Sequence, residues 1–213
     1  EADVLLTDDE KDRIRVIVIL AFFTIFFWAA FEQAGGLMTL YTDAKVNRFL
    51  FGFEIPTTWF QAVNPAFIVI FGPIAATIWR VLGERKIEPT TPTKMALGLM
   101  IMGSGFLFMV LASLQSQGGN KASLFLIVAA YIFHTIGELC LSPVGLSMVT
   151  KLAPLRVGSL MMGVWFVSNV VANKAAAMIG GYSESLGEKT LFIGIFAVSI
   201  AAGLVLLALS KQL

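Results

Sequence analysis

The chain has 213 residues, of which 57% are hydrophobic and 14% are charged, and its formal net charge is +1. Soluble globular domains typically have about 25% charged residues, so this composition excludes an ordinary soluble protein. The chain has no basic stripe that would indicate a nucleic-acid partner. Its one cysteine and one histidine exclude an internal disulfide and a Cys/His metal cluster.

Residues 1–13 are polar and acidic, and they hold six of the chain's 14 acidic residues. This stretch is unlike a signal peptide, so we expect a cytoplasmic linker that leads into the first helix. Thr7-Asp8-Asp9-Glu10 fits a capping box, which predicts that the helix starts before the membrane. Because the chain begins with Glu, we expect it to be the C-terminal piece of a longer protein.

Six stretches are long and apolar enough to cross a membrane, which takes about 20 residues. Loop residues such as Gly, Pro and Asn separate them. The sequence therefore predicts an all-α membrane bundle over residues 14–210, with spans at about 14–41, 57–81, 94–114, 123–150, 157–180 and 190–209.

Basic residues set the orientation of these spans. With six spans the two termini share one side, and ten of the 15 Lys and Arg residues fall there, against four on the other side. We therefore expect both termini in the cytoplasm. We expect the protein in the plasma membrane or the inner membrane of the cell. The opposite side holds Lys45, Arg48, Lys121 and Lys189.

The first span carries Glu32, an acid that follows a run of aromatic residues and precedes Gly35-Gly36, where a helix could bend. We interpret Glu32 as a functional carboxylate, with a packing role as the alternative. The outer loop that follows holds Asp43, Lys45 and Arg48. We expect such exposed charges to be solvated, with an ion pair that gates the outer mouth as the alternative.

The second span contains Asn64-Pro65, with Gln61 on the same helix face. Proline frees a carbonyl inside the membrane, which is best tolerated beside a cavity or a partner helix. We expect the helix to break here and Asn64 to contact a ligand, with a simple polar kink as the alternative.

Glu138, in the fourth span, is the most informative residue of the chain. A charge at the centre of a bilayer costs about 2.5–3.5 kcal/mol or more, so such acids usually face a cavity and carry function. Burial favours the neutral acid and a nearby cation favours the charged form, so Glu138 could exchange a proton for an amine. His134 precedes it by one turn; we expect a neutral imidazole bonded to the backbone, with a proton relay as the alternative.

The fifth span carries Trp165, Asn169 and Asn173 at intervals of four residues, which indicates a pocket wall or a helix contact through amides. Lys174 lies on the opposite face near the outer interface, where we expect it to snorkel. The six spans are also interpreted as two inverted groups of three, with Glu32 and Glu138 on equivalent helices.

Four segments together resemble the C-terminal half of the proton-dependent oligopeptide transporter (POT) family, part of the major facilitator superfamily. The most specific is Gly137-Glu138-Leu139-Cys140-Leu141-Ser142-Pro143-Val144-Gly145-Leu146-Ser147. The others are Phe27-Trp28-Ala29-Ala30-Phe31-Glu32-Gln33-Ala34-Gly35, Trp59-Phe60-Gln61-Ala62-Val63-Asn64-Pro65 and Met162-Gly163-Val164-Trp165-Phe166. The resemblance covers the family's seventh to twelfth helices and implies half of a twelve-helix fold.

The resemblance implies a proton-coupled symporter of di- and tripeptides that has no cofactor, with protons as the coupling ion. Glu138 and Asn64 would bind the peptide's amino end, Ser142 and Trp165 would complete the pocket, Glu32 would join Glu138 in proton coupling, and Asp43 would gate. The partners are the missing N-terminal half, which carries the cation for Glu138, the peptide and the lipid bilayer. Nitrate or another small solute as substrate, or a non-transporting subunit, remain alternatives.

An intramembrane enzyme is the main competing class, but its expected catalytic set is absent from this sequence. His134 and Ser142 lie eight residues apart on one helix, about 12 Å along its axis, too far for a hydrogen-bonded dyad. A channel would show filter loops or charge rings, and no loop has that pattern. We therefore expect a transporter half and not an enzyme.

Overall fold

The computed structural model describes residues 6–213, and within them six helical segments are long and apolar enough to cross a membrane. This confirms the all-α, six-span fold class. The long helices are α1 (Asp8–Phe31), α3 (Val63–Glu84), α4 (Thr91–Gln115), α5 (Leu124–Leu152), α6 (Gly158–Gly181) and α8 (Glu188–Leu209). The division into a linker over residues 1–13 and a bundle over residues 14–210, and the two inverted repeats, stay predictions.

The first span begins with the predicted capping box. The Thr7 hydroxyl accepts from the Glu10 backbone N–H at 3.3 Å, and the Glu10 carboxylate accepts from the Thr7 N–H at 2.9 Å. The span is bent in the middle: α1 stops at Phe31, a 3-10 turn covers Glu32–Ala34, and α2 (Leu37–Lys45) follows Gly35-Gly36. The bend that the glycine pair suggested is therefore present.

The second span corrects the expected break at Asn64-Pro65. A 3-10 helix covers Thr57–Ala62, and α3 starts at Val63, so Pro65 lies in the first turn of an α-helix. A proline there removes no intrahelical hydrogen bond, because the first N–H groups of a helix have no partner within it. The discontinuity is a change of helix type just before Asn64.

Short strands connect the helices at the end of the bundle where α2 ends and α5 begins. β1 (Val46–Asn47) pairs in parallel with β4 (Ala122–Ser123), and β2 (Phe49–Leu50) pairs with β3 (Phe53–Glu54) as a hairpin. Gly52 turns this hairpin with a φ of 83°. The parallel pair ties the loop after α2 to the start of α5, although the two segments are far apart in sequence.

The centre of the bundle is α4, which packs against α5 and α8. Small residues allow the close approach: a Cβ on Gly137 of α5 would lie 2.7 Å from the Gly98 carbonyl oxygen of α4, and a Cβ on Gly203 of α8 would lie 2.5 Å from Met100 Cγ. α1 packs against α6, where the buried hydroxyls of Thr24 and Ser168 are 2.9 Å apart.

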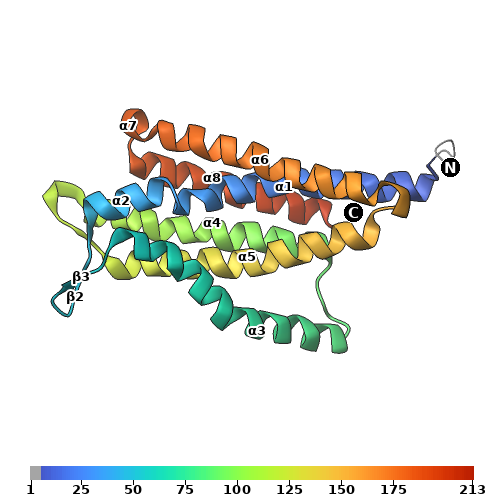
Figure 1. Cartoon of the computed structure of the whole chain (residues 1–213), viewed down its shortest axis with the longest axis horizontal. Helices are drawn as coiled ribbons and strands as arrows, with labels where there is room; N and C mark the ends of the chain where they lie inside the picture. Colours follow the sequence, from blue (N-terminus) through green and yellow to red (C-terminus); the bar gives the residue numbers. More distant parts are fainter. Residues whose placement is uncertain (1–5) are drawn as a thin grey trace.

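Figure 1 shows the start of α1 and the end of α8 at one end of the bundle, and the hairpin and α7 (Ser183–Leu186) at the other. α3 starts beside α5 and then leaves the bundle, and none of its residues is buried. The first turn of α3, the middle of α5 and the bend after α1 therefore meet in one half of the bundle, where three of the predicted site residues lie: Glu32, Asn64 and Glu138.

Candidate functional site

Glu138 and Asn64 contact each other between α5 and α3. The Asn64 amide nitrogen Nδ2 donates to Glu138 Oε2 at 3.0 Å, and both side chains are partly buried. This is the only hydrogen bond of the Glu138 carboxylate to the described residues 6–213, and none of their cations pairs with it. The chain therefore leaves acceptor capacity on Glu138 for a ligand or a cation from elsewhere.

Thr135 joins this pair and was not predicted. Its side chain is fully buried; Oγ1 accepts from the same Asn64 Nδ2 at 3.1 Å and donates to the Tyr131 carbonyl at 2.8 Å. A threonine is common in apolar spans, so it does not stand out in the sequence. Thr135 could have been predicted from its position three residues before Glu138, which places both side chains on one face of the helix.

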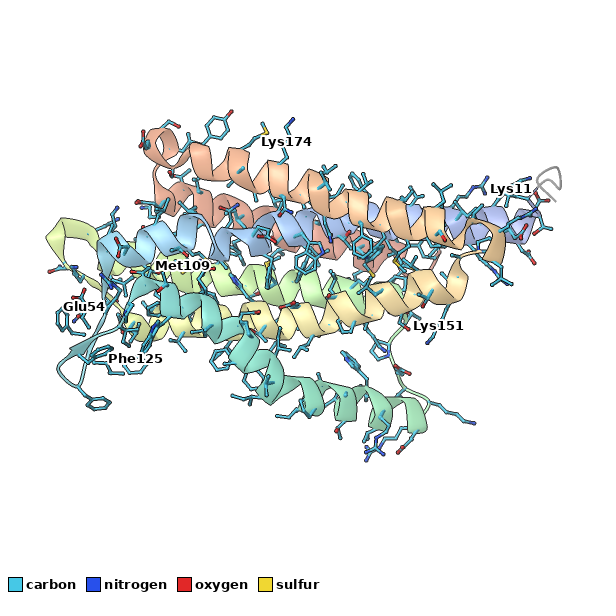
Figure 2. The ribbon with its side chains drawn as sticks, in the orientation of Figure 1. Lys11, Glu54, Met109, Phe125, Lys151 and Lys174 are labelled. Carbon is cyan, nitrogen blue, oxygen red and sulfur yellow. The ribbon has the colours of Figure 1, made fainter. Side chains whose placement is uncertain are left out.

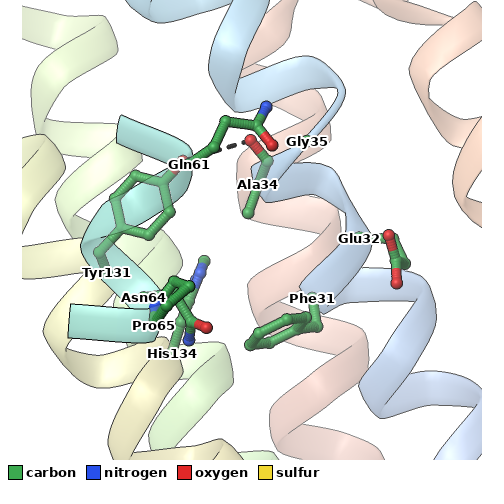
Figure 3. A pocket seen from close by; sticks show the side chains of 9 residues that line it. All are labelled: Phe31, Glu32, Ala34, Gly35, Gln61, Asn64, Pro65, Tyr131 and His134. Atoms are coloured by element: carbon green, nitrogen blue, oxygen red, sulfur yellow. Dashed lines mark hydrogen bonds between the residues drawn. The ribbon is translucent and has the colours of Figure 1, made fainter. Parts of the chain in front are cut away.

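A cavity of about 190 Å³ opens beside Asn64. Figure 3 shows the residues that line it, drawn from the α1–α2 bend, the start of α3 and the middle of α5. Tyr131 donates its hydroxyl proton to the Ala34 carbonyl at 3.2 Å, which closes the cavity between α5 and the bend. The lining residues are Phe31, Glu32, Ala34, Gly35, Gln61, Asn64, Pro65, Tyr131 and His134.

Glu32 lines this cavity but does not meet Glu138. It lies across from Asn64 in Figure 3, on the 3-10 turn, and its exposed carboxylate makes no hydrogen bond or ion pair with the described part of the chain. Its neighbour Gln33 is the structural residue: buried, it donates to the carbonyls of Ala29 and Ala176, each at 3.1 Å. Glu32 is therefore open to solvent or to a partner outside the described residues.

His134 is buried as expected, but the expected bond to the backbone is wrong. Neither ring nitrogen has a hydrogen-bond partner among residues 6–213. The ring packs 4.8 Å from the Phe106 ring, measured between centroids, and a Cβ on Gly105 would lie 2.7 Å from its Cδ2. The imidazole therefore fills the contact between α4 and α5.

Ser142 and Trp165 lie further along the bundle, toward the end that carries the termini. Ser142 is one turn beyond Glu138 on α5 and is partly buried. Trp165 of α6 is only 3% exposed, and its ring packs so closely on α5 that a Cβ on Gly145 would lie 2.5 Å from it. Within the described chain Trp165 thus backs the α5 segment that carries Ser142, and lines none of the cavities described here.

The rest of the predicted stripe on α6 does not act as a unit. Asn169 is partly buried, with an Oδ1 that has no partner in the described residues, whereas Asn173 is exposed. Figure 2 shows Lys174 pointing out from α6, where it is exposed. The expected snorkelling of Lys174 to the membrane interface stays a prediction.

At the end of α2, Asp43 forms an ion pair with Arg48, which was the alternative to solvated charges, whereas Lys45 pairs with Glu188. Arg48 Nη2 lies 3.3 Å from Asp43 Oδ1 and 2.9 Å from Glu54 Oε1, and Thr57 donates to Asp43 at 2.7 Å. The Asp43 side chain is 67% exposed. The Arg48 side chain is only 14% exposed, so the pair joins an exposed acid to a largely buried guanidinium. It ties the hairpin to the end of α2.

Lys94, at the opposite end of the bundle, is a second residue that the sequence did not single out. It is 8% exposed, forms an ion pair with Glu88, and its ammonium lies 4.7 Å from the centroid of the Trp79 ring. These contacts hold the second half of α3 near α4, across a groove of about 640 Å³. Lys94 is thus occupied and cannot serve as the cation for Glu138.

Known proteins share both the sequence and the fold. The peptide transporter YePEPT of Yersinia enterocolitica subsp. palearctica is 40% identical over 82% of this chain and 35% of its own length. The di-/tripeptide transporter of Lactococcus lactis subsp. cremoris is 34% identical over 96% of this chain and 42% of its own. A crystal structure of a mutant of the peptide transporter POT in complex with alafosfalin is 34% identical, has a TM-score of 0.89, and is matched over 99% of this chain and 43% of that one.

The chain thus spans about 40% of the length of the relatives it matches. The family model described as the POT family, a family of transporters, matches residues 4–192, most of the chain. The six apolar helices of this chain, together with the family match, identify a membrane protein. This chain belongs to the POT family.

Proposed function

We propose that the chain is the C-terminal half of a proton-coupled symporter that carries di- and tripeptides. The observation that supports this most is the partly buried Glu138 carboxylate, which is held by one amide donor and has no cation partner among residues 6–213. An acid kept in that state can bind the ammonium group of a peptide or a lysine from another segment. The names of the relatives supply the substrate class.

The site residues have distinct roles in this proposal. Glu138 and Asn64 bind the peptide's amino end, Ser142 contacts the substrate one turn further along α5, and Trp165 forms the wall behind that turn. Glu32, which lines the same cavity as Asn64, joins Glu138 in proton coupling. Asp43 acts at the outer mouth through its pair with Arg48.

Transport follows from movement of this bundle against the missing N-terminal half, which exposes the site to each side in turn. Proton entry supplies about 2.3 kcal/mol per charge for each 100 mV of membrane potential. In this proposal the protein is not an enzyme and uses no cofactor; protons are the coupling ion. It lies in the plasma or inner membrane with both ends of this chain in the cytoplasm.

The test is uptake by the full-length protein in proteoliposomes. A labelled dipeptide, nitrate and a sugar are compared with and without an inward proton gradient. We expect the dipeptide alone to accumulate, and only with the gradient. Accumulation of nitrate or the sugar instead would move the protein to another substrate class, and no uptake of any solute would favour a non-transporting subunit.

A further inference from the structure

Resting on this proposed function, we propose that Thr135 is a positioning residue for substrate binding. It fixes the amide of Asn64 so that the amide oxygen, Oδ1, faces the peptide and accepts from its ammonium group. Thr135 itself touches no substrate. Its effect passes through Asn64 alone, which makes it separable from a general packing role.

The hydroxyl of Thr135 has a single proton, and a hydrogen bond within α5 takes up that proton. Oγ1 lies 2.8 Å from the Tyr131 carbonyl oxygen, which can only accept, so the proton points there. Toward Asn64, 3.1 Å away, Oγ1 then has only lone pairs to offer. The group of Asn64 that faces Thr135 must therefore be the NH₂ group.

The second acceptor fixes the same orientation. Glu138 Oε2 lies 3.0 Å from Asn64 Nδ2, and an ionised carboxylate is also acceptor-only. The two N–H groups of one amide are thus shared between Thr135 and Glu138. A reversed amide would place Oδ1 against two acceptors and leave two donors without partners, which is unfavourable in a partly buried site.

This orientation leaves the amide oxygen of Asn64, Oδ1, free to accept a hydrogen bond. No described residue donates to it, and Asn64 lines the 190 Å³ cavity beside the site (Figure 3). A fixed acceptor next to the Glu138 carboxylate gives an ammonium group two oxygen partners with set directions. Without Thr135, one N–H of the amide loses its acceptor and the amide can rotate, so that part of this alignment is lost.

The test uses full-length protein and measures dipeptide affinity by calorimetry and KM by uptake. Thr135→Val removes the hydroxyl at nearly constant shape, and we expect affinity to fall about five- to tenfold. Thr135→Ser keeps the hydroxyl and should stay within about twofold of wild type. Thr24→Val is the matched control, because Thr24 is also fully buried and bonded to a carbonyl and a side chain, but at the α1–α6 contact.

A double-mutant cycle decides whether the effect passes through Asn64. In an Asn64→Ala background, Thr135→Val should cause less than about a twofold further loss. A full five- to tenfold loss in that background would overturn the inference, as would a Ser variant as weak as the Val variant, or an unchanged Val variant of a wild type that binds dipeptide. A wild type that does not bind dipeptide at all would overturn the proposed function as well.

Discussion

Glu138 is held inside the bundle by contacts that suit the charged carboxylate, since its partner is a donor, yet its partly buried setting suits the neutral acid. Neither form is strongly fixed by this chain. A group in that balance responds to whatever cation approaches, so protonation and cargo binding can exclude each other at one oxygen pair.

Replacing Glu138 by Gln tests this exchange. Glutamine keeps the shape and can still accept from Asn64, but it cannot gain or lose a proton. We expect dipeptide accumulation driven by a proton gradient to fall to the level of empty liposomes. Counterflow, which needs no net proton movement, should survive.

The control is Glu184→Gln, which removes an exposed acid of α7 whose carboxylate makes no hydrogen bond or ion pair within residues 6–213. It should transport like the wild type. Gradient-driven accumulation by the Glu138→Gln protein at wild-type level would show that the proton is carried elsewhere.

At the scale of residues, the sequence predicted the acid and the amide of the site but missed the threonine between them. Glu138 and Asn64 were predicted because a charge and a proline-linked amide stand out in apolar spans, and the structure brings them within 3.0 Å. Thr135 and Lys94 were not, because a threonine is common in helices and a lysine near a span's end is expected to be solvated. His134 shows the reverse error: its hydrogen bond was assumed, whereas its ring is used for packing.

At the scale of elements, the spans were predicted from apolar length and the bend after α1 from its glycine pair, but the break in the second span was misplaced. The change from a 3-10 helix to α3 just before Asn64 leaves no mark in hydropathy, and Pro65 misleads because it reads as a break and acts as a first-turn residue. The contact between α4 and α5 depends on glycines whose partners lie on the other helix. The sequence alone does not show which residues face them, so this contact could not be predicted.

Gly137→Ala tests that contact. The added Cβ would lie 2.7 Å from the Gly98 carbonyl oxygen and 2.9 Å from the Met102 backbone nitrogen, so α4 and α5 must move apart. We expect the free energy of unfolding to fall by about 1–3 kcal/mol, measured as thermal unfolding in detergent. Gly194→Ala on α8 is the control, because nothing lies within 4 Å of its added Cβ; it should be neutral or slightly stabilising. Equal stability of the two variants would argue against the close packing.

At the scale of the whole molecule, this bundle has a solvent-facing Glu32, an unpaired Glu138 and a helix, α3, with no buried residue in the described chain. Exposed apolar surface of that extent is stable only against lipid or protein. Glu32 and the start of α3 line the same cavity, and Glu138 bonds to Asn64, which also lines it. The proposed second half would therefore cover the face on which these two acids have no cation partner among the described residues.

The orientation of this bundle gives the last prediction. Ten of the basic residues are expected on the side that holds both termini, which predicts that the hairpin lies outside the cell. Phe51, fully exposed at the tip of the hairpin, and Gln212, exposed after α8, mark the two sides. In a full-length protein with Cys140 and any other cysteine replaced by Ser, Phe51→Cys should react with a membrane-impermeant maleimide in intact cells, and Gln212→Cys only after permeabilisation. Cys140 itself is 7% exposed, so its replacement changes little surface. Labelling of Gln212→Cys in intact cells, with Phe51→Cys protected, would invert the topology and place the Asp43–Arg48 pair at a cytoplasmic gate instead of an outer one.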